Sequence, residues 1–264
     1  MEMPRNGFKR ALAARRPQIG LFLGMADAHV ADLLADTGFD WLLIDGEHGP
    51  NDLRTILAQL RTLAAHEAHA VVRILDHNPA RIKQLVDVGA QTLMAPMVET
   101  AAQARELVRA MRYPPLGIRG VGTAMARAAR WNGVGDYFAH ADAEQCLIVQ
   151  IESQAALEDL DNIARVDGVD GVFVGPSDLA ASLGHLGNPG HPDVQAKVRD
   201  AIARITAAGK AAGVFSADPA LGAAYLEGGA SFMLVGVDTL LLRNAAIGLA
   251  ARFKERTATP GTAY

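Results

Sequence analysis

Eight short apolar segments recur along this 264-residue chain, separated by longer segments whose apolar residues are spaced three and four apart. The short segments are continuously apolar, which is typical of parallel strands buried on both faces. We expect helices over 51–66, begun by Asn51 as N-cap, and over 100–112, 153–165 and 194–209. The expected strands are 19–24, 41–45, 70–74, 92–96, 147–152, 171–175, 211–215 and 232–236.

Eight strands alternating with helices over about 250 residues predict an α/β fold, a closed (β/α)8 TIM barrel. A doubly wound open sheet is the competing architecture. No glycine-rich nucleotide-binding fingerprint supports that alternative, since GIRGVG (117–122) has the wrong spacing and follows no expected strand. We expect one barrel domain over residues 1–264, with 257–264 as a flexible tail.

Composition narrows the classes of partner and compartment. Half of the residues are hydrophobic, the net charge is only −4, and no basic stripe indicates a nucleic-acid partner. The single cysteine, Cys146, excludes an internal disulfide framework, fits a reducing cytoplasm, and lies in an apolar run where we expect it to be buried. No signal peptide and no apolar stretch of membrane-spanning length is visible, so we predict a soluble cytoplasmic protein without a membrane partner.

One connection is unusually long. More than thirty residues separate the helix ending near Arg112 from the strand starting near Leu147, and Arg119, Arg127 and Arg130 make this segment basic. Connections of this length inside a compact barrel carry extra helices or a function. A solvated helix face and a substrate-covering role both remain open for it.

Polar side chains gather where the expected strands end, which is where TIM barrels build their active sites. The second strand runs into DGEHGP, the third contains an arginine, the fifth ends in QIE, and the sixth runs into GPSD at the start of a helix. In a strand, positions two apart share a face, so Gln150 and Glu152 point the same way. The residues in question are Asp45, Glu47, His48, Arg73, Gln150, Glu152, Ser177 and Asp178.

Each of these residues has a purely structural alternative. Asp178 alone fits a helix-dipole contact, Glu152 a pairing with a cation, Arg73 an ion pair with Asp45, and His48 a turn hydrogen bond. The alternatives weaken jointly, because several carboxylates at one buried mouth need a compensating positive charge. A hard, oxygen-preferring cation such as Mg²⁺ or Mn²⁺ suits them. HEAH (66–69) lacks zinc-site spacing, and we interpret it as an exposed helix end.

The motifs DGEHGP, APMVET, YPPLGIRG, IVQIES and VFVGPSDLAASLG, together with the closing LVGVDTLLL, occur in order over nearly the whole chain. The sequence resembles the HpcH/HpaI aldolases, which are class II pyruvate aldolases acting on 4-hydroxy-2-oxo acids. The resemblance implies reversible cleavage to pyruvate, or a related 2-oxo acid, and an aldehyde through a pyruvate enolate. It also implies a divalent metal, Mg²⁺ or Mn²⁺ with Co²⁺ possible, and a homo-oligomer, suggested to be a hexamer.

The same resemblance implies individual roles. Glu152 and Asp178 would hold the metal, Arg73 would stabilise the enolate oxygen, and His48 would be the base or its water relay, positioned by Asp45. The donor would be held by Gln150, Ser177 and the backbone of Gly175, Pro176, Ser177 and Asp178, whose helix amides would receive its carboxylate.

Asp87 is matched in the family by an aspartate that raises the basicity of the histidine. It precedes the fourth strand and so lies at the opposite end of its own barrel. We expect it to act only on a neighbouring subunit, which fits a homo-oligomer.

Several alternatives stay open at different levels. A class I aldolase needs a Schiff-base lysine, but only Lys210 adjoins a strand, and it does so at the wrong end. A citrate lyase-like acyl-CoA lyase and a non-catalytic barrel that binds a keto acid and a metal are the other readings. The sequence does not identify the acceptor aldehyde. Candidates for setting the specificity for it are Phe215, Ser216 and the arginine-rich connection.

Overall fold

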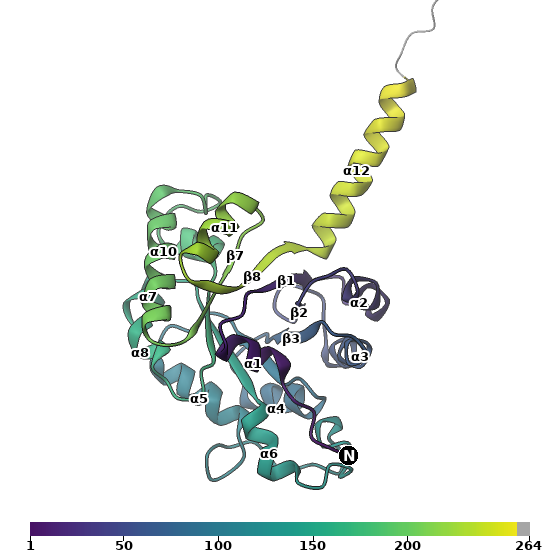
Figure 1. The fold of residues 1–264 in the computed structure, drawn as a ribbon, viewed down its shortest axis with the longest axis vertical. Coiled ribbons are helices and arrows are strands. Elements are labelled where there is room, and N and C mark those ends of the chain that lie inside the picture. Colours follow the sequence, from purple (N-terminus) through teal and green to yellow (C-terminus); the bar gives the residue numbers. More distant parts are fainter. Residues whose placement is uncertain (258–264) are drawn as a thin grey trace, which may run out of the picture.

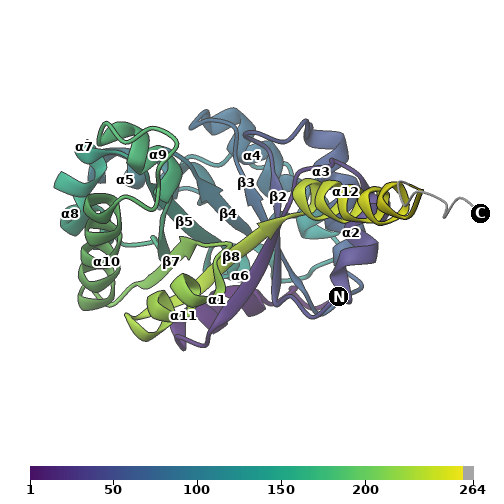
Figure 2. The ribbon, with the colours of Figure 1, turned by 90° about the horizontal axis from the view of Figure 1, so that it is seen from above.

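The computed structural model describes residues 1–257, with side chains through Lys254. Its strands form one closed barrel in which each is parallel to both neighbours and β8 closes on β1. Figure 2 looks onto this barrel, with helices around its outside. The TIM barrel predicted from the sequence is therefore confirmed. The strands are β1 (Gln18–Leu23), β2 (Trp41–Asp45), β3 (His69–Arg73), β4 (Thr92–Ala95), β5 (Cys146–Ile151), β6 (Gly171–Val174), β7 (Ala211–Phe215) and β8 (Ala230–Val237).

The helices follow the apolar periodicity, with the long connection before β5 carrying a 3-10 turn (Arg127–Ala129) and a short helix of its own. They are α1 (Gly7–Ala13), α2 (Ala28–Ala35), α3 (Leu53–Leu63), α4 (Pro79–Asp87), α5 (Ala101–Met111), α6 (Tyr137–Glu144), α7 (Gln154–Glu158), α8 (Leu160–Ala164), α9 (Pro176–Ser182), α10 (Pro192–Ala207), α11 (Pro219–Glu227) and α12 (Asp238–Thr257).

Three local predictions were wrong. Segment 153–165 is two helices that meet at Asp159, and α3 ends at Leu63, so the HEAH motif forms a turn whose last histidine begins β3. The N-cap of α3 is Asp52, not Asn51, because the Asp52 carboxylate accepts the amides of Arg54 and Thr55. Asn51 instead donates to the main-chain oxygen of Asp45 at 2.8 Å, tying the end of β2 to the start of α3.

The inward-facing side chains of the barrel change from apolar to polar along the strands. Trp41 and Leu43 of β2 belong to the interior cluster, and Asp45 follows at the same parity; on β5, Cys146 and Ile148 precede Gln150. Cys146 is a free, buried thiol, as predicted. The parallel strands thus gather the charged side chains Asp45 and Arg73, together with Gln150, at their carboxyl ends.

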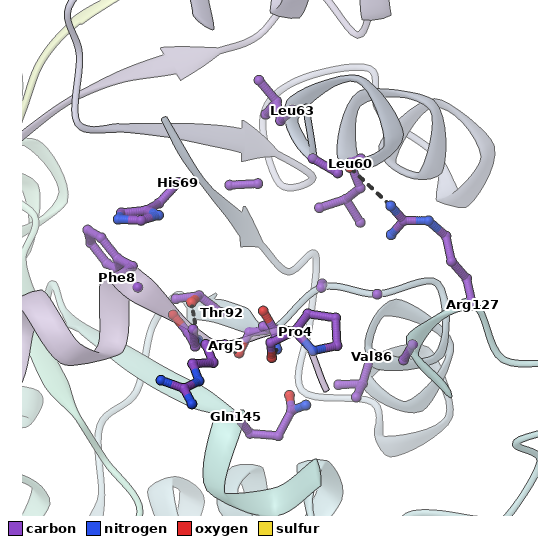
Figure 3. Close-up of a pocket in the computed structure, with 18 of the residues that line it drawn as sticks. Pro4, Arg5, Phe8, Leu60, Leu63, His69, Val86, Thr92, Arg127 and Gln145 are labelled. Carbon is purple, nitrogen blue, oxygen red and sulfur yellow. Dashed lines mark hydrogen bonds between the residues drawn. The ribbon is translucent and has the colours of Figure 1, made fainter. Parts of the chain in front are cut away.

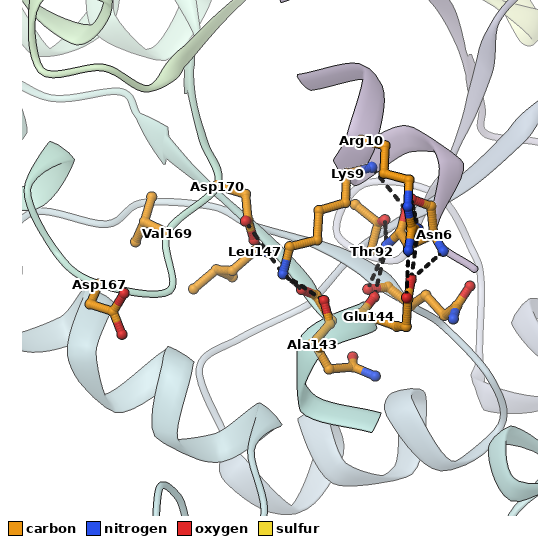
Figure 4. A network of polar contacts seen from close by, with 12 residues as sticks. Asn6, Lys9, Arg10, Thr92, Ala143, Glu144, Leu147, Asp167, Val169 and Asp170 are labelled. Carbon is orange, nitrogen blue, oxygen red and sulfur yellow. Dashed lines mark hydrogen bonds and ion pairs between the residues drawn. The ribbon is translucent and has the colours of Figure 1, made fainter. Parts of the chain in front are cut away.

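Helix α1 closes the opposite end. Phe8 and Leu12 complete the interior cluster, and the Phe8 ring lies 5.1 Å from that of Trp41. Polar contacts fix the helix: the Lys9 ammonium reaches the main chain at the end of α6, and Arg10 forms an ion pair with Glu144 (Figure 4). A cavity of about 260 Å³ lies beside helix α1 (Figure 3), lined by α1, α3, α4 and the 3-10 turn.

Helix α12 leaves the barrel instead of packing against it (Figure 1). At least half of the surface of each of its large apolar side chains is exposed: Leu240, Leu241, Leu242, Ile247, Leu249 and Phe253. Through Thr257, no helix is both long and apolar enough to cross a bilayer, and α12 is no exception. Apart from Thr257, the tail predicted to be flexible, 257–264, lies outside the described residues.

We expect Phe8→Ala to lower the free energy of unfolding by about 3–5 kcal/mol, because it empties the base of the barrel interior. Urea denaturation followed by circular dichroism measures this. Leu186→Ala, at a side chain that is 85% exposed, is the control and should stay within about 0.5 kcal/mol of wild type. Equal effects of the two substitutions would contradict the conclusion that Phe8 of α1 fills the base of the barrel interior.

Candidate active site at the carboxyl ends of the strands

The turn after β2 is organised by the carboxylate of Asp45. Its Oδ1 accepts the amide of Glu47 at 3.0 Å and, more weakly, that of His48 at 3.4 Å. Gly46 and Gly49 are required here, because a side chain at either would collide with the main-chain oxygen of Arg73 or of Asp45. The turn projects His48 into solvent, with 71% of its side chain exposed.

Arg73, the last residue of β3, lies at the centre of the polar cluster. Its Nε and Nη2 donate to the two oxygens of Asp45 at 2.8 and 2.7 Å, and its Nη1 lies 2.9 Å from Oε2 of Glu47. The guanidinium also lies over the ring of Phe22, 5.0 Å from its centroid. The ion pair between Arg73 and Asp45 that the sequence left open as a structural alternative is present. Two guanidinium N–H groups remain beyond these three contacts.

A second carboxylate lies at the end of β5. Oε1 of Glu152 accepts from Nε2 of Gln150 at 3.1 Å, and Oε2 accepts the amide of Met97 at 3.0 Å. Gly175 at the end of β6 packs against this carboxylate so closely that any side chain there would displace it. The strand-end alternation predicted for Gln150 and Glu152 therefore brings both into the barrel mouth.

The start of α9 supplies the remaining predicted residues. Pro176 is buried at its first position, while Ser177 and Asp178 are exposed to the mouth side of the helix start. Asp178 is close enough to raise the pKa values of both Glu47 and Glu152 by charge repulsion. The three carboxylates therefore share one electrostatic environment.

Burial dominates the electrostatics of Glu152. Desolvation raises its pKa to about 7; the Met97 amide opposes this, and the charges of Asp178 and Glu47 add to it. Burial likewise raises the pKa of Glu47, against the attraction of Arg73. Asp45 behaves in the opposite way, because Arg73 and two turn amides outweigh its burial and lower its pKa. Arg73 is thus neutralised by Asp45 and Glu47, leaving the Glu152 side short of positive charge.

A divalent cation fits this donor set. The available atoms are carboxylate and amide oxygens, which hard ions such as Mg²⁺ and Mn²⁺ prefer. Oε1 of Gln150 is buried and accepts no hydrogen bond from residues 1–254, so an acceptor adjoins Glu152 with nothing to bind. A cation would also favour the ionised form of Glu152 that burial disfavours.

Two residues of the mouth had no predicted role. Glu47 was noticed in the sequence, but its pairing with Arg73 depends on strand register, because Asp45 lies opposite Arg73 in the β2–β3 pair. Met97 contributes through its backbone: at φ 51° it adopts the left-handed region and aims its amide at Glu152. Side-chain type gives no signal for such a contact.

Asp87 is the one predicted residue that the chain does not bring to this mouth. It ends α4 at the other end of the barrel, as predicted, where Oδ1 accepts from Nη2 of Arg119 at 2.7 Å. Arg119 is only 1% exposed, lies over the ring of Tyr113 and donates to the hydroxyl of Tyr137. Within residues 1–254 its Nε and Nη1 have no hydrogen-bond partner. The Asp87 side chain keeps 26% of its surface exposed.

Lys210 is also placed at that end. Its ammonium donates to the main-chain oxygens of Val169 at 2.7 Å and Val166 at 3.3 Å. This geometry keeps it away from the carboxyl ends of the strands, as the sequence predicted. It offers no amine for Schiff-base chemistry at the mouth.

A parallel eight-stranded barrel whose carboxylates, arginine and histidine gather at the carboxyl ends of the strands defines a TIM-barrel enzyme site. The sequence matches the profile of the HpcH/HpaI aldolase/citrate lyase family over residues 18–245. The chain belongs to this family, and the resemblance drawn from its motifs is confirmed.

Individual relatives are similar over nearly the full length. The chain is 57% identical to the hydroxypyruvate/pyruvate aldolase of Pseudomonas aeruginosa over 260 residues, 98% of this chain and 97% of that one. It is 57% identical to the 4-hydroxy-2-oxo-heptane-1,7-dioate aldolase of Klebsiella pneumoniae over 254 residues, 96% of each chain. A solved HpcH/HpaI aldolase/citrate lyase family protein from Burkholderia cenocepacia superposes with a TM-score of 0.90 at 40% identity, covering 94% of this chain and 99% of that one.

The raised pKa of Glu152 predicts how the stability of the metal-free protein depends on pH. Between the ordinary value of 4.5 and about 7 the folded state holds a proton that the unfolded state has lost. Stability from this carboxyl is therefore complete below about pH 4.5 and lost as pH rises through 7. We expect Glu152→Gln to leave stability unchanged at acid pH and to raise it at pH 8, by at most about 3 kcal/mol.

Urea denaturation in excess chelator at both pH values measures this difference. Glu158→Gln, a surface carboxylate on α7, serves as the control and should show no such trend. A Glu152→Gln effect that is equal at both pH values would contradict the raised pKa.

Proposed function

We propose that this protein is a class II pyruvate aldolase, which cleaves a 4-hydroxy-2-oxo acid reversibly to pyruvate, or a related 2-oxo acid, and an aldehyde. The observation that carries the proposal is the barrel mouth itself, where Arg73 from β3 and Glu152 from the end of β5 lie close enough for the charge of Arg73 to act on the pKa of Glu152. The two 57%-identical relatives, both named as aldolases, support the reaction class.

We infer that Glu152 and Asp178 hold a divalent metal ion, Mg²⁺ or Mn²⁺, with Co²⁺ as a further fitting ion. Such an ion supplies Lewis-acid polarisation of a keto oxygen. The pKa raised by burial at Glu152 and the free acceptor on Gln150 support this assignment. The ligand set itself comes from the family resemblance.

Arg73 is suited to stabilise the enolate oxygen. Asp45 and Glu47 hold its guanidinium at fixed orientation, so little reorganisation is needed when negative charge develops on the substrate. Its two remaining N–H groups are available to that oxygen. Removal of a methyl proton from pyruvate and breaking of the carbon–carbon bond in the substrate both generate this charge, so one arginine serves both directions.

His48 is suited to move the proton, directly or through a water molecule. Its Nε2 lies 3.9 Å from Oε2 of Glu47, and its exposure leaves the ring free to approach a bound substrate. Asp45 acts as a positioning residue, because it orders the turn that carries His48 while binding Arg73. Following the family resemblance, Gln150 and the backbone of residues 175–178 would hold the donor, whose carboxylate would meet the amides at the start of α9.

We propose further that the protein is a homo-oligomer of identical chains, and the family resemblance suggests a hexamer. The apolar side chains of α12 support association, because α12 projects from its own barrel (Figure 1) and a second copy is the partner always present. Asp87 supports the same idea, since it can join a site only on a neighbouring subunit. There it would strengthen His48 as a base, with Arg119 as its anchor.

The first test follows pyruvate alone, so that no acceptor aldehyde need be assumed. In D₂O with Mg²⁺ or Mn²⁺, we expect loss of the methyl proton signal by NMR, reporting enolate formation. Arg73→Ala should slow this exchange by about 10²–10³-fold, as expected for loss of an oxyanion donor. Glu152→Ala should abolish the metal-dependent exchange, because it removes a proposed metal ligand.

Arg109→Ala is the matched control, because Arg109 is an exposed arginine on α5 whose ion pair within residues 1–254 is with Glu106 of the same helix. It should exchange at the wild-type rate. Folded wild-type protein that gives no exchange with Mg²⁺, Mn²⁺ or Co²⁺ would refute pyruvate as the donor.

A second test asks whether His48 and Asp87 act across subunits. His48→Ala and Asp87→Asn should each be slow when pure, but co-expressed hybrids should recover about a quarter of wild-type exchange if subunits mix randomly. Hybrid oligomers contain sites that take His48 from one chain and Asp87 from its neighbour. Hybrid activity equal to the mean of the two pure variants would contradict sharing between subunits.

A further inference from the structure

Two histidines and an aspartate meet in the loop between α9 and α10, away from the carboxylates of the barrel mouth. The loop spans residues 183–191 and contains Gly184 and Gly187, both at positive φ. His185 lies within it, His191 ends it as the N-cap of α10, and Asp193 follows in the first turn. The proposed function makes no use of this cluster.

The two imidazole rings are stacked, with centroids 3.6 Å apart and planes inclined by 15°. Nε2 of His185 lies 3.7 Å from Oδ2 of Asp193, and Nδ1 of His191 lies 3.8 Å from the same oxygen. The ligand atoms of all three residues lie within 4.8 Å of one another. Within residues 1–254, no lysine or arginine forms an ion pair with Asp193.

These separations are close to those of a metal site. Zn²⁺ binds histidine nitrogen and carboxylate oxygen at about 2.0–2.2 Å, which for tetrahedral geometry places ligand atoms roughly 3.4 Å apart. The two measured separations exceed this by only a few tenths of an ångström. The stacked rings hold their in-plane lone pairs in nearly parallel planes, so metal binding requires rotation of the imidazoles about their side-chain torsions to make the lone pairs converge.

Exposure indicates how many ligands the chain would supply. The side chains of His185 and His191 are 27% and 32% exposed, so both imidazoles are partly buried, whereas Asp193 is 75% exposed. A fourth position would therefore face solvent and take water. His191 also accepts the amide of Asp193 at a long 3.3 Å, a weak contact that an incoming ion would replace.

We propose that His185, His191 and Asp193 form a second metal site, specific for a borderline transition-metal ion of the Zn²⁺ or Co²⁺ class. Two nitrogens and one oxygen select such ions, whereas the oxygen-only mouth selects Mg²⁺ or Mn²⁺. The ion would join both ends of the 183–191 loop, which starts directly after the helix that carries Asp178. Its role is to order this loop, and it does not take part in the reaction.

The test titrates tag-free, chelator-treated protein with Co²⁺ while excess Mg²⁺ occupies the mouth. We expect one Co²⁺ per chain by calorimetry, with the strong visible absorption typical of tetrahedral rather than octahedral Co²⁺. His185→Gln and His191→Gln should each weaken this binding by more than about tenfold and remove the absorption. His140→Gln, at an exposed histidine on α6, is the matched control and should bind as wild type.

Pyruvate exchange with Mg²⁺ should stay unchanged in both loop variants, which also shows that they fold. A measurement on wild-type protein avoids the variants altogether: added Zn²⁺ should shift the imidazole Cε1–H NMR signals of His185 and His191 and leave that of His140 in place. Binding that survives both substitutions, or Zn²⁺ shifts at His140 but not at the loop pair, would overturn the site. Loss of pyruvate exchange in wild type would bear only on the proposed function.

Discussion

The polar end of this barrel depends on one buried ion pair, between Arg73 at the end of β3 and Asp45 at the end of β2. A charge buried alone would be costly, and replacing Arg73 by an apolar residue would leave the Asp45 carboxylate uncompensated. The pair is bidentate, which fixes orientation as well as charge. The Asp45 carboxylate also accepts hydrogen bonds from the amides of the following turn. The direction of Arg73 and the position of His48 are therefore set together.

The same pair divides the mouth into two electrostatic halves. Glu47 also lies against Arg73, so the β2–β3 half is satisfied internally. The β5–β6 half has Glu152 and Asp178, with amide donors from Gln150 and Met97 but no cation in direct contact with Glu152 among the described side chains. Burial therefore raises the pKa of Glu152, and this half is where the proposed divalent ion would stabilise the protein most. The division fits the proposal that arginine and metal act on one substrate, because the two would not pair with the same carboxylates.

The sequence predicted the elements well because strand and helix periodicity are local properties. It also predicted the end of the barrel at which Gln150 and Glu152 lie, since alternation along a strand needs no tertiary information. It did not reveal that Glu47 binds Arg73, because this depends on the register that sets Asp45 opposite Arg73. The left-handed backbone of Met97 was invisible for another reason: methionine has no preference for that conformation, and the surrounding fold imposes it. The N-cap of α3 was misassigned because Asn51 and Asp52 are both good caps, and the main-chain oxygen of Asp45 competes for Asn51.

The far end of the barrel shows why one chain does not account for all of its polar residues. Arg119 is buried, and two of its nitrogens have no hydrogen-bond partner among the described side chains and main chain, a costly arrangement unless its contact with Asp87 serves a purpose. Tyr113 and Tyr137 enclose the guanidinium, and Asp87 remains partly exposed at the surface. The cluster therefore presents a fixed carboxylate outward from the end opposite the mouth. A carboxylate at one end and an exposed histidine at the other could meet between two chains across a two-fold axis, where each chain gives its carboxylate to the other, or in a head-to-tail ring. The apolar α12 projects from the same chain, so the proposed homo-oligomer would have both a polar contact to direct it and apolar surface to stabilise it.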